Sequence, residues 1–182
     1  AARCAFELAL LDCLGKCWNL NISHIAGLTR HRGALRYSMV LPFLDEKAND
    51  ALLHRAKEVG FRDVKIKVDA GDPTGPVERA RHILGDDVEL RVDANCAWSR
   101  DNAPGFMRGL AGLGVVSVEE PLPAGDLEGL AELRGQGLAM ITLDESVGSL
   151  EEVHRIADAA AADVLNIRIS KCGGILAAMR MI

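Results

Sequence analysis

The chain has 182 residues, of which 49% are hydrophobic and 26% are charged, and its formal net charge at pH 7 is −5. This balance is typical of a globular protein with a sizeable core. A negative charge without a basic stripe argues against nucleic acid and against an anionic membrane as partners. The apolar runs end well before the roughly 18 residues of a membrane span, and the N-terminus lacks a signal-peptide core. We therefore expect a soluble, cytoplasmic protein.

The five cysteines, an odd number without a Cys-x-x-Cys pair, predict reduced thiols. Cys13 and Cys17 lie one helical turn apart and could form half of a metal site, but no second pair of ligands follows at zinc spacing, so ordinary buried thiols are preferred. Cys96 is interpreted as a packing residue. A nucleophilic role for Cys172 is disfavoured because no histidine accompanies it in a local motif.

The first third of the chain predicts a helix, a loop, a strand and a second helix. Residues 2–18 have apolar side chains typical of a largely buried helix that ends at Gly15. Residues 19–33 are polar and irregular, as in a linker. A strand is expected over 34–41, followed by a helix from Asp45.

The remaining sequence alternates between strand and helix. The further strands are expected at 64–68, 88–93, 115–119, 140–144 and 164–170, and the helices between and after them at 77–84, 100–113, 127–134, 149–161 and 175–182. Such alternation indicates parallel strands joined by right-handed crossovers.

A charged residue stands at the end of each of the last five expected strands. These residues are Lys67, Asp93, Glu119, Asp144 and Lys171, and successive members lie 26, 26, 25 and 27 residues apart. A doubly wound sheet would bind its ligand at one switch point, usually after a glycine-rich turn, and no Gly-x-Gly-x-x-Gly follows any strand here. A (β/α)8 barrel instead brings residues from several strands to one face. The barrel is therefore preferred.

Three of the strand-end residues, Asp93, Glu119 and Asp144, are acids that would converge at the mouth of a barrel. A single acid of this kind more often caps a helix or pairs with arginine. Three at an even period favour a bound cation, and an all-oxygen ligand set suits Mg²⁺.

Lys65 and Lys67 are two residues apart on one strand and so point to the same face. Since Val64, Ile66 and Val68 need the buried outer face, the lysines are expected inside the barrel. There each would lower the pKa of the other, which would prepare a neutral lysine to act as a base.

Five short motifs lie at or near the ends of the expected strands: Lys65-Ile66-Lys67, VDAN at 92–95, VEEP at 118–121, LDES at 143–146 and SKCGG at 170–174. They resemble motifs of the enolase superfamily, muconate lactonizing enzyme subgroup. Each motif is weak alone, but the set in this order and spacing is highly specific.

The resemblance implies that Asp93, Glu119 and Asp144 bind Mg²⁺, with Mn²⁺ as an alternative ion. Asn95 and Glu145 would be supporting polar residues near the metal.

The same resemblance makes Lys67 and Lys171 the acid/base pair on opposite sides of the substrate, with Lys65 tuning Lys67 and stabilising the enolate. Sites of this superfamily combine such a base with Mg²⁺ that stabilises an ene-diolate. The implied reaction is Mg²⁺-dependent abstraction of the proton α to the carboxylate of a small substrate, leading to isomerisation, racemisation or epimerisation, or cycloisomerisation.

Several alternatives stay open. β-Elimination of the o-succinylbenzoate synthase type shares the first step. A lysine on the sixth strand argues against the mandelate racemase branch. A catalytically incompetent fragment or assembly module would keep the carboxylates without turnover. A flavodoxin-like binding domain is disfavoured, because it would not explain charged residues at five successive strand ends.

The expected fold is a partial TIM-type (β/α) barrel of about six of eight βα units, preceded by the last helix of an α+β capping domain. Residues 1–33 would be the remnant of the capping domain with a linker, and 34–182 the incomplete barrel. Most of the capping domain would precede Ala1, and two strands would follow Ile182. Six strands leave two open edges. The resemblance also implies a homo-oligomer, as a dimer or octamer.

Overall fold

The computed structural model describes residues 1–27 and 33–182. The chain forms two compact units. The sheet unit comprises residues 36–146 and 156–165, and the helical unit comprises residues 1–35, 147–155 and 166–182. The expected division of the chain at residues 33 and 34 stays a prediction.

The sheet unit contains one parallel sheet of six strands. They are β1 (Met39–Leu41), β2 (Asp63–Lys67), β3 (Glu89–Asp93), β4 (Val115–Glu119), β5 (Met140–Leu143) and β6 (Val164–Leu165). Their order in the sheet is their order in the chain. A doubly wound sheet reverses direction at a switch point, whereas this sheet adds every strand at the same edge. The order is that of the expected barrel.

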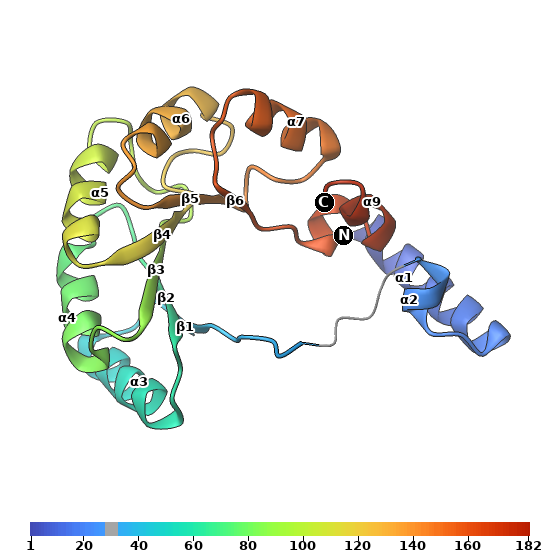
Figure 1. Ribbon diagram of the computed structural model, residues 1–182, viewed down its shortest axis with the longest axis horizontal. Helices are drawn as coiled ribbons and strands as arrows, with labels where there is room; N and C mark the ends of the chain where they lie inside the picture. Colours follow the sequence, from blue (N-terminus) through green and yellow to red (C-terminus); the bar gives the residue numbers. More distant parts are fainter. Residues whose placement is uncertain (28–32) are drawn as a thin grey trace. The chain divides into compact units, whose positions relative to one another are not determined.

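Helices cover one face of the curved sheet (Figure 1). They are α3 (Glu46–Val59), α4 (Thr74–Leu84), α5 (Ala103–Gly112) and α6 (Leu127–Gly135), and α7 (Leu150–Asp158) follows β5. Each expected helix is confirmed, with ends displaced by a few residues. α4 begins at Thr74 rather than Val77, because Pro76 is accommodated in its first turn, where a missing backbone N–H costs nothing.

The strands alternate between an apolar outer face and a polar inner face. On β2 and β3 the outer side chains Val64, Ile66, Leu90 and Val92 are at most 1% exposed. The residues between them, Lys65 among them, point to the opposite side. The expectation that the lysines of β2 face the inside of the sheet is confirmed.

The two edge strands are shorter than expected. β1 covers only 39–41 of the expected 34–41, and β6 only two residues of 164–170. An edge strand pairs on one side, and β6 follows β5 only through the partners of Thr142 and Leu143, where β5 ends. Beyond this ladder the chain turns into α8 (Ile169–Cys172). Lys171 therefore lies in a short helix and not at a strand end.

The helical unit contains α1 (Ala2–Trp18), α2 (Ile22–Ile25), α8 and α9 (Ile175–Met179). Cys172, Ala178 and Met181 form its small core, with Val153 and Ile167 against them. α2 was not expected, since it lies in the stretch predicted as a loop.

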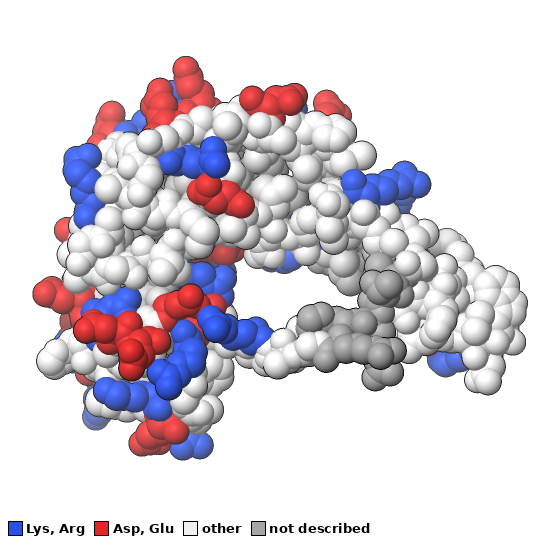
Figure 2. Space-filling view, in the orientation of Figure 1, with Lys and Arg blue, Asp and Glu red and all other residues white. Residues whose placement is uncertain are grey.

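The prediction of a largely buried N-terminal helix is wrong. In α1 only Cys4, Leu11 and Gly15 are buried, whereas Phe6 is 75% exposed. On the face seen in Figure 2, the surface over α1 and α2 is mostly uncharged, in contrast to the interspersed charges over the sheet unit. The apolar residues of α1 do not gather on one face, so packing against one side leaves several uncovered.

The helix also passes through its expected end. Gly15 is inside α1, where an added Cβ would lie 2.9 Å from the carbonyl oxygen of Leu20. Asn19, with φ of 50°, ends the helix in the left-handed conformation that was expected of Gly15.

All five cysteines are free, but Cys13 and Cys17 are exposed, so their interpretation as buried thiols is wrong. Among the described residues, no helix combines the length and apolar character needed to cross a membrane.

Candidate active site

Lys65 joins two strand-end carboxylates on the inner face of the sheet. Its Nζ lies 2.8 Å from Oδ2 of Asp93 and 3.1 Å from Oε2 of Glu119. The register explains this contact, because Asp93 on β3 pairs directly with Glu119 on β4. Both acids are at most 5% exposed. The single positive charge of the ammonium group thus reduces the repulsion between two buried carboxylates.

The electrostatics of Lys65 differ from the expectation. Burial alone would lower its pKa, but hydrogen bonds and Coulombic attraction from Asp93, together with Glu119, outweigh burial, and the pKa is raised. The predicted mutual lowering by two neighbouring lysines is wrong for Lys65, because the nearest charges are negative. Lys65 is a fixed positive charge here rather than a neutral base.

Lys67 occupies a different environment from Lys65. Its Nζ lies 2.6 Å from Oδ1 of Asn95 and 3.4 Å from Oδ2 of Asp93. Asn95 in turn donates through Nδ2 to Oε1 of Glu145 at 3.2 Å. A chain of hydrogen bonds therefore runs from β2 to the loop after β5, and it connects the two residues expected to support the site with a candidate base.

Asp144 follows β5 and is 4% exposed. Its carboxylate does not form a compact group of ligands with Asp93 and Glu119: in the part of the chain that the structure describes, no such trio has its oxygens within 4.8 Å of one another. The register accounts for this separation, since Glu119 pairs with Thr142, two residues before Asp144. The three acids still offer the all-oxygen donor set that Mg²⁺ prefers, and the ammonium group of Lys65 lies between two of them.

Glu120 was not singled out from the sequence, yet its side chain is fully buried. Oε1 accepts hydrogen bonds from the backbone N–H groups of Asp144 at 3.0 Å and Ser146 at 2.6 Å. Burial raises the pKa of Glu120, while these hydrogen bonds act in the opposite direction. The available signal was two consecutive acids at a strand end, because alternation cannot place both on the inner face.

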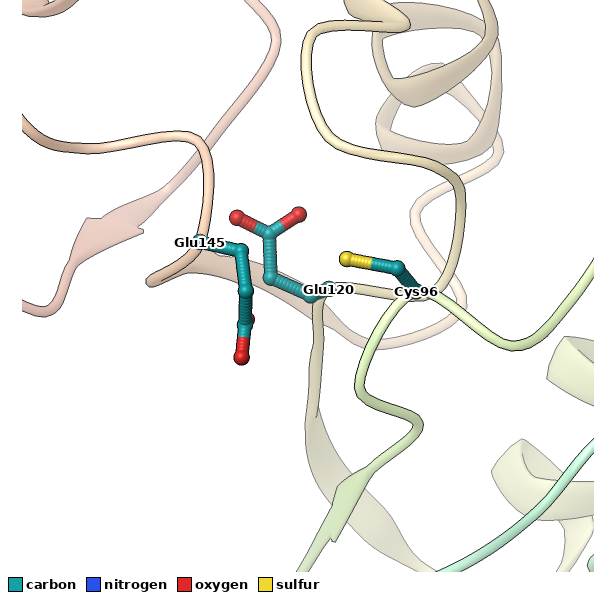
Figure 3. A group of neighbouring side chains, drawn as sticks. All are labelled: Cys96, Glu120 and Glu145. Atoms are coloured by element: carbon teal, nitrogen blue, oxygen red, sulfur yellow. The ribbon is translucent and has the colours of Figure 1, made fainter.

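Cys96, Glu120 and Glu145 form the one described group of three metal-type side chains within 4.8 Å of one another. In Figure 3 the thiol of Cys96 points toward Glu120, while the carboxyl groups of Glu120 and Glu145 point in opposite directions. Burial and the two carboxylates raise the pKa of Cys96 to about 11. A metal would need the thiolate, which this environment disfavours, so the group is a poor candidate for a metal centre.

Lys171 belongs to the helical unit. It lies in α8, which ends at Gly173 with φ of 93°. At the next residue, Gly174, an added Cβ would overlap the Glu7 carboxylate of α1, which accepts a hydrogen bond from the N–H of Ile175. The two glycines of the SKCGG motif therefore permit the turn and the close approach of α1. The expected position of Lys171 opposite Lys67 stays a prediction.

A cavity of about 710 Å³ opens beside the carboxyl ends of β1 and β2. Its lining includes Leu41, Phe43, Leu44, Lys67, Asp69 and Arg79. Lys67 thus borders both the carboxylate cluster and a space large enough for a small molecule. The apolar part of this lining, Phe43 and Leu44, was not anticipated from the sequence.

A parallel sheet with its strands in chain order and charged residues at successive strand ends defines a (β/α)-barrel enzyme domain. Residues 48–182 match the family described as enolase C-terminal domain-like, and the chain belongs to this family. The resemblance to the enolase superfamily, muconate lactonizing enzyme subgroup, is confirmed.

Similar proteins carry three kinds of isomerase name. The chain is 28% identical to an N-succinyl-L-Arg/Lys racemase of Bacillus cereus, over 99% of the chain and 49% of the relative. It is 30% identical to a hydrophobic dipeptide epimerase of Enterococcus faecalis, over 100% of the chain and 51% of the relative. The crystal structure of muconate cycloisomerase from Pseudomonas fluorescens superposes with a TM-score of 0.90 at 32% identity, over 99% of the chain and 51% of that structure. The chain spans about half the length of these proteins.

Proposed function

We propose that the chain supplies the catalytic strand ends of an isomerase that removes the proton α to the carboxylate of a small substrate. The observation that carries the proposal is the position of Lys67, a residue of the cavity lining whose amine contacts Asn95 and Asp93. A base must border the space in which the substrate carbon lies. The similarity to racemases, epimerases and cycloisomerases supports the same class of reaction.

Some residues of the site would supply or bind positive charge, and another would transfer the proton. Asp93, Glu119 and Asp144 would hold Mg²⁺, which when bound supplies positive charge beside the substrate carboxylate. Lys65 keeps a second positive charge on the same face, since its pKa is raised, and so favours the negative charge that develops when the proton leaves. Lys67 takes up the α proton.

Lys171 is proposed as the second member of the acid/base pair. Return of the proton by Lys171 would invert the α carbon, as in racemisation or epimerisation. Return by Lys67 would retain the configuration. Asn95 holds Lys67 in place through the 2.6 Å hydrogen bond and is itself held by Glu145.

The proposal extends to the substrate, the oligomeric state and the compartment of the protein. The substrate is a small carboxylate, such as an N-acyl amino acid, a dipeptide or a muconate-type diacid. The active protein is a cytoplasmic homo-oligomer. The five free cysteines support a reducing compartment.

Proton exchange at the α carbon tests this function. The chain would be incubated with Mg²⁺ in D₂O with N-succinyl amino acids, dipeptides or muconolactone, and the α-proton signal followed by NMR. We expect exchange with at least one of these compounds, and none after Lys67→Ala. Lys47→Ala, at an exposed position of α3, is the matched control and should exchange at the wild-type rate. Equal exchange by the Lys67→Ala variant would contradict the assignment of the base.

A further inference from the structure

Glu120 places a carboxyl group where a charge is costly, because its side chain is fully buried. Three hydrogen bonds offset this cost. Oε1 accepts from the N–H of Asp144 and of Ser146, and Oε2 accepts from Oγ of Ser146 at 3.2 Å. All three donors belong to the loop that follows β5.

The backbone of Glu120 also forms hydrogen bonds with two other segments, β5 and the loop after β3. Its N–H donates to the carbonyl oxygen of Thr142 on β5, and its own carbonyl oxygen accepts from the N–H of Cys96, in the loop after β3. Glu120 has a φ of 39°, in the left-handed region. Such a conformation is unfavourable for glutamate and persists only where the surroundings stabilise it. The turn directs the side chains of Glu119 and Glu120 to different neighbours.

Asp144 is the residue at which the chain leaves the sheet. The ladder between β5 and β6 ends with Leu143 and Leu165. The N–H of Asp144 donates to the side chain of Glu120 at 3.0 Å. The side chain of Glu120 therefore holds the backbone at the point where the expected metal ligand begins its loop.

We propose that Glu120 is a positioning residue that holds the backbone at Asp144 in place, so that the carboxylates of Asp93, Glu119 and Asp144 can bind one Mg²⁺ ion. The inference rests on the proposed function, in which Asp144 is a metal ligand. Groups that hold metal ligands in place typically change metal affinity by 10- to 100-fold when they are removed.

Mg²⁺ titration of the 182-residue chain and its variants tests this role. Glu120→Ala removes the acceptor of three hydrogen bonds, and we expect at least a tenfold loss of Mg²⁺ affinity. Glu120→Gln keeps a carbonyl oxygen for the two N–H groups and should retain most of the affinity. The matched control is Ser117→Ala, which removes the buried 2.7 Å hydrogen bond between Ser117 and Thr142 on the same strands. It should lower stability without weakening Mg²⁺ binding.

Amide hydrogen exchange gives a readout that needs no metal. In Glu120→Asp the shorter side chain cannot reach both donors, so the amides of Asp144 and Ser146 should exchange faster. The amide of Ala94, which donates to the carbonyl of Glu119, is the internal reference and should not change. This variant keeps a carboxyl group and serves if Glu120→Ala does not fold.

The outcomes separate the two proposals. Wild-type Mg²⁺ binding that is equally tight in Glu120→Ala, or unchanged exchange of Asp144 and Ser146 in Glu120→Asp, would overturn the positioning role alone. A wild-type chain that binds no Mg²⁺ would contradict the proposed function and the metal-related role of Glu120 together.

Discussion

The two faces of the sheet carry opposite kinds of residue, although both come from the same strands. The outer face buries aliphatic side chains such as Leu90 and Ile66 under the helices, at no more than 1% exposure. The inner face places Lys65 between Asp93 and Glu119. The outer face stabilises the fold through apolar burial, whereas the inner face holds buried charges that stabilise one another through ion pairs. Neighbouring residues on one strand therefore serve different purposes: one side chain packs in the core and the next lies in the candidate site.

The largest expected loss of stability comes from the outer face. Leu90→Ala should lower the free energy of unfolding by about 2–5 kcal/mol, because it removes a fully buried side chain and leaves a cavity. Urea denaturation measures the change. Met140→Ala, at a residue that is 45% exposed, is the control and should cost much less. Similar losses for the two variants would contradict the assignment of the core.

A smaller loss of stability, which Mg²⁺ should partly reverse, is expected from a substitution on the inner face. Lys65→Met removes the ammonium between Asp93 and Glu119 and should cost about 2–3 kcal/mol in metal-free buffer, somewhat less than for a fully buried pair because Lys65 is partly solvated. Added Mg²⁺ should raise the melting temperature of this variant more than that of the wild type, since the ion replaces the missing charge. A variant that Mg²⁺ does not stabilise would argue against a cation site between these acids.

The smallest loss of stability is expected at the N-terminus of α6. Asp126 caps α6 by accepting from the N–H of Gly129 and pairs with Arg100. Asp126→Ala should cost about 1 kcal/mol, as for other N-caps.

The stabilisation by the ion pair of Asp126 and Arg100 should depend on pH. Arg100 lowers the pKa of Asp126 below its usual range. The stabilisation is therefore present above about pH 4, the value for an unfolded chain, and is lost as the pH falls through the folded value. Asp126→Asn keeps the cap but should remove this part of the acid sensitivity. An unchanged difference in stability between wild type and Asp126→Asn from pH 6 to pH 2 would contradict the pairing.

The repeating part of the fold could be predicted from the sequence because its signals are local. Alternation on β2 fixed the direction of Lys65, and the even spacing of the strand-end residues indicated the barrel. Edge strands depend on a neighbour, so the ends of β1 and β6 could not be predicted from their own residues. The exposure of Phe6 on α1 was missed for a related reason, since an apolar helix does not specify which of its sides is covered.

The candidate site, too, could be predicted from the sequence only in part. The individual acids and lysines were found at strand ends, but the sign of the pKa shift of Lys65 depends on which charges lie nearest in space. Glu120 was missed because its role arises from a positive φ and from a loop 24 residues further along the chain. Local pattern identified the chemical groups, and tertiary contacts determined how they are held.

The central claim is that Asp93, Glu119 and Asp144 together form a Mg²⁺ site. Isothermal titration of Mg²⁺ into the metal-free chain, repeated on Asp144→Asn, tests it most directly, because the substitution removes one ligand charge at nearly constant shape. We predict binding by the wild-type chain that is lost in the variant. No binding by the wild type, or equal binding by Asp144→Asn, would contradict the account.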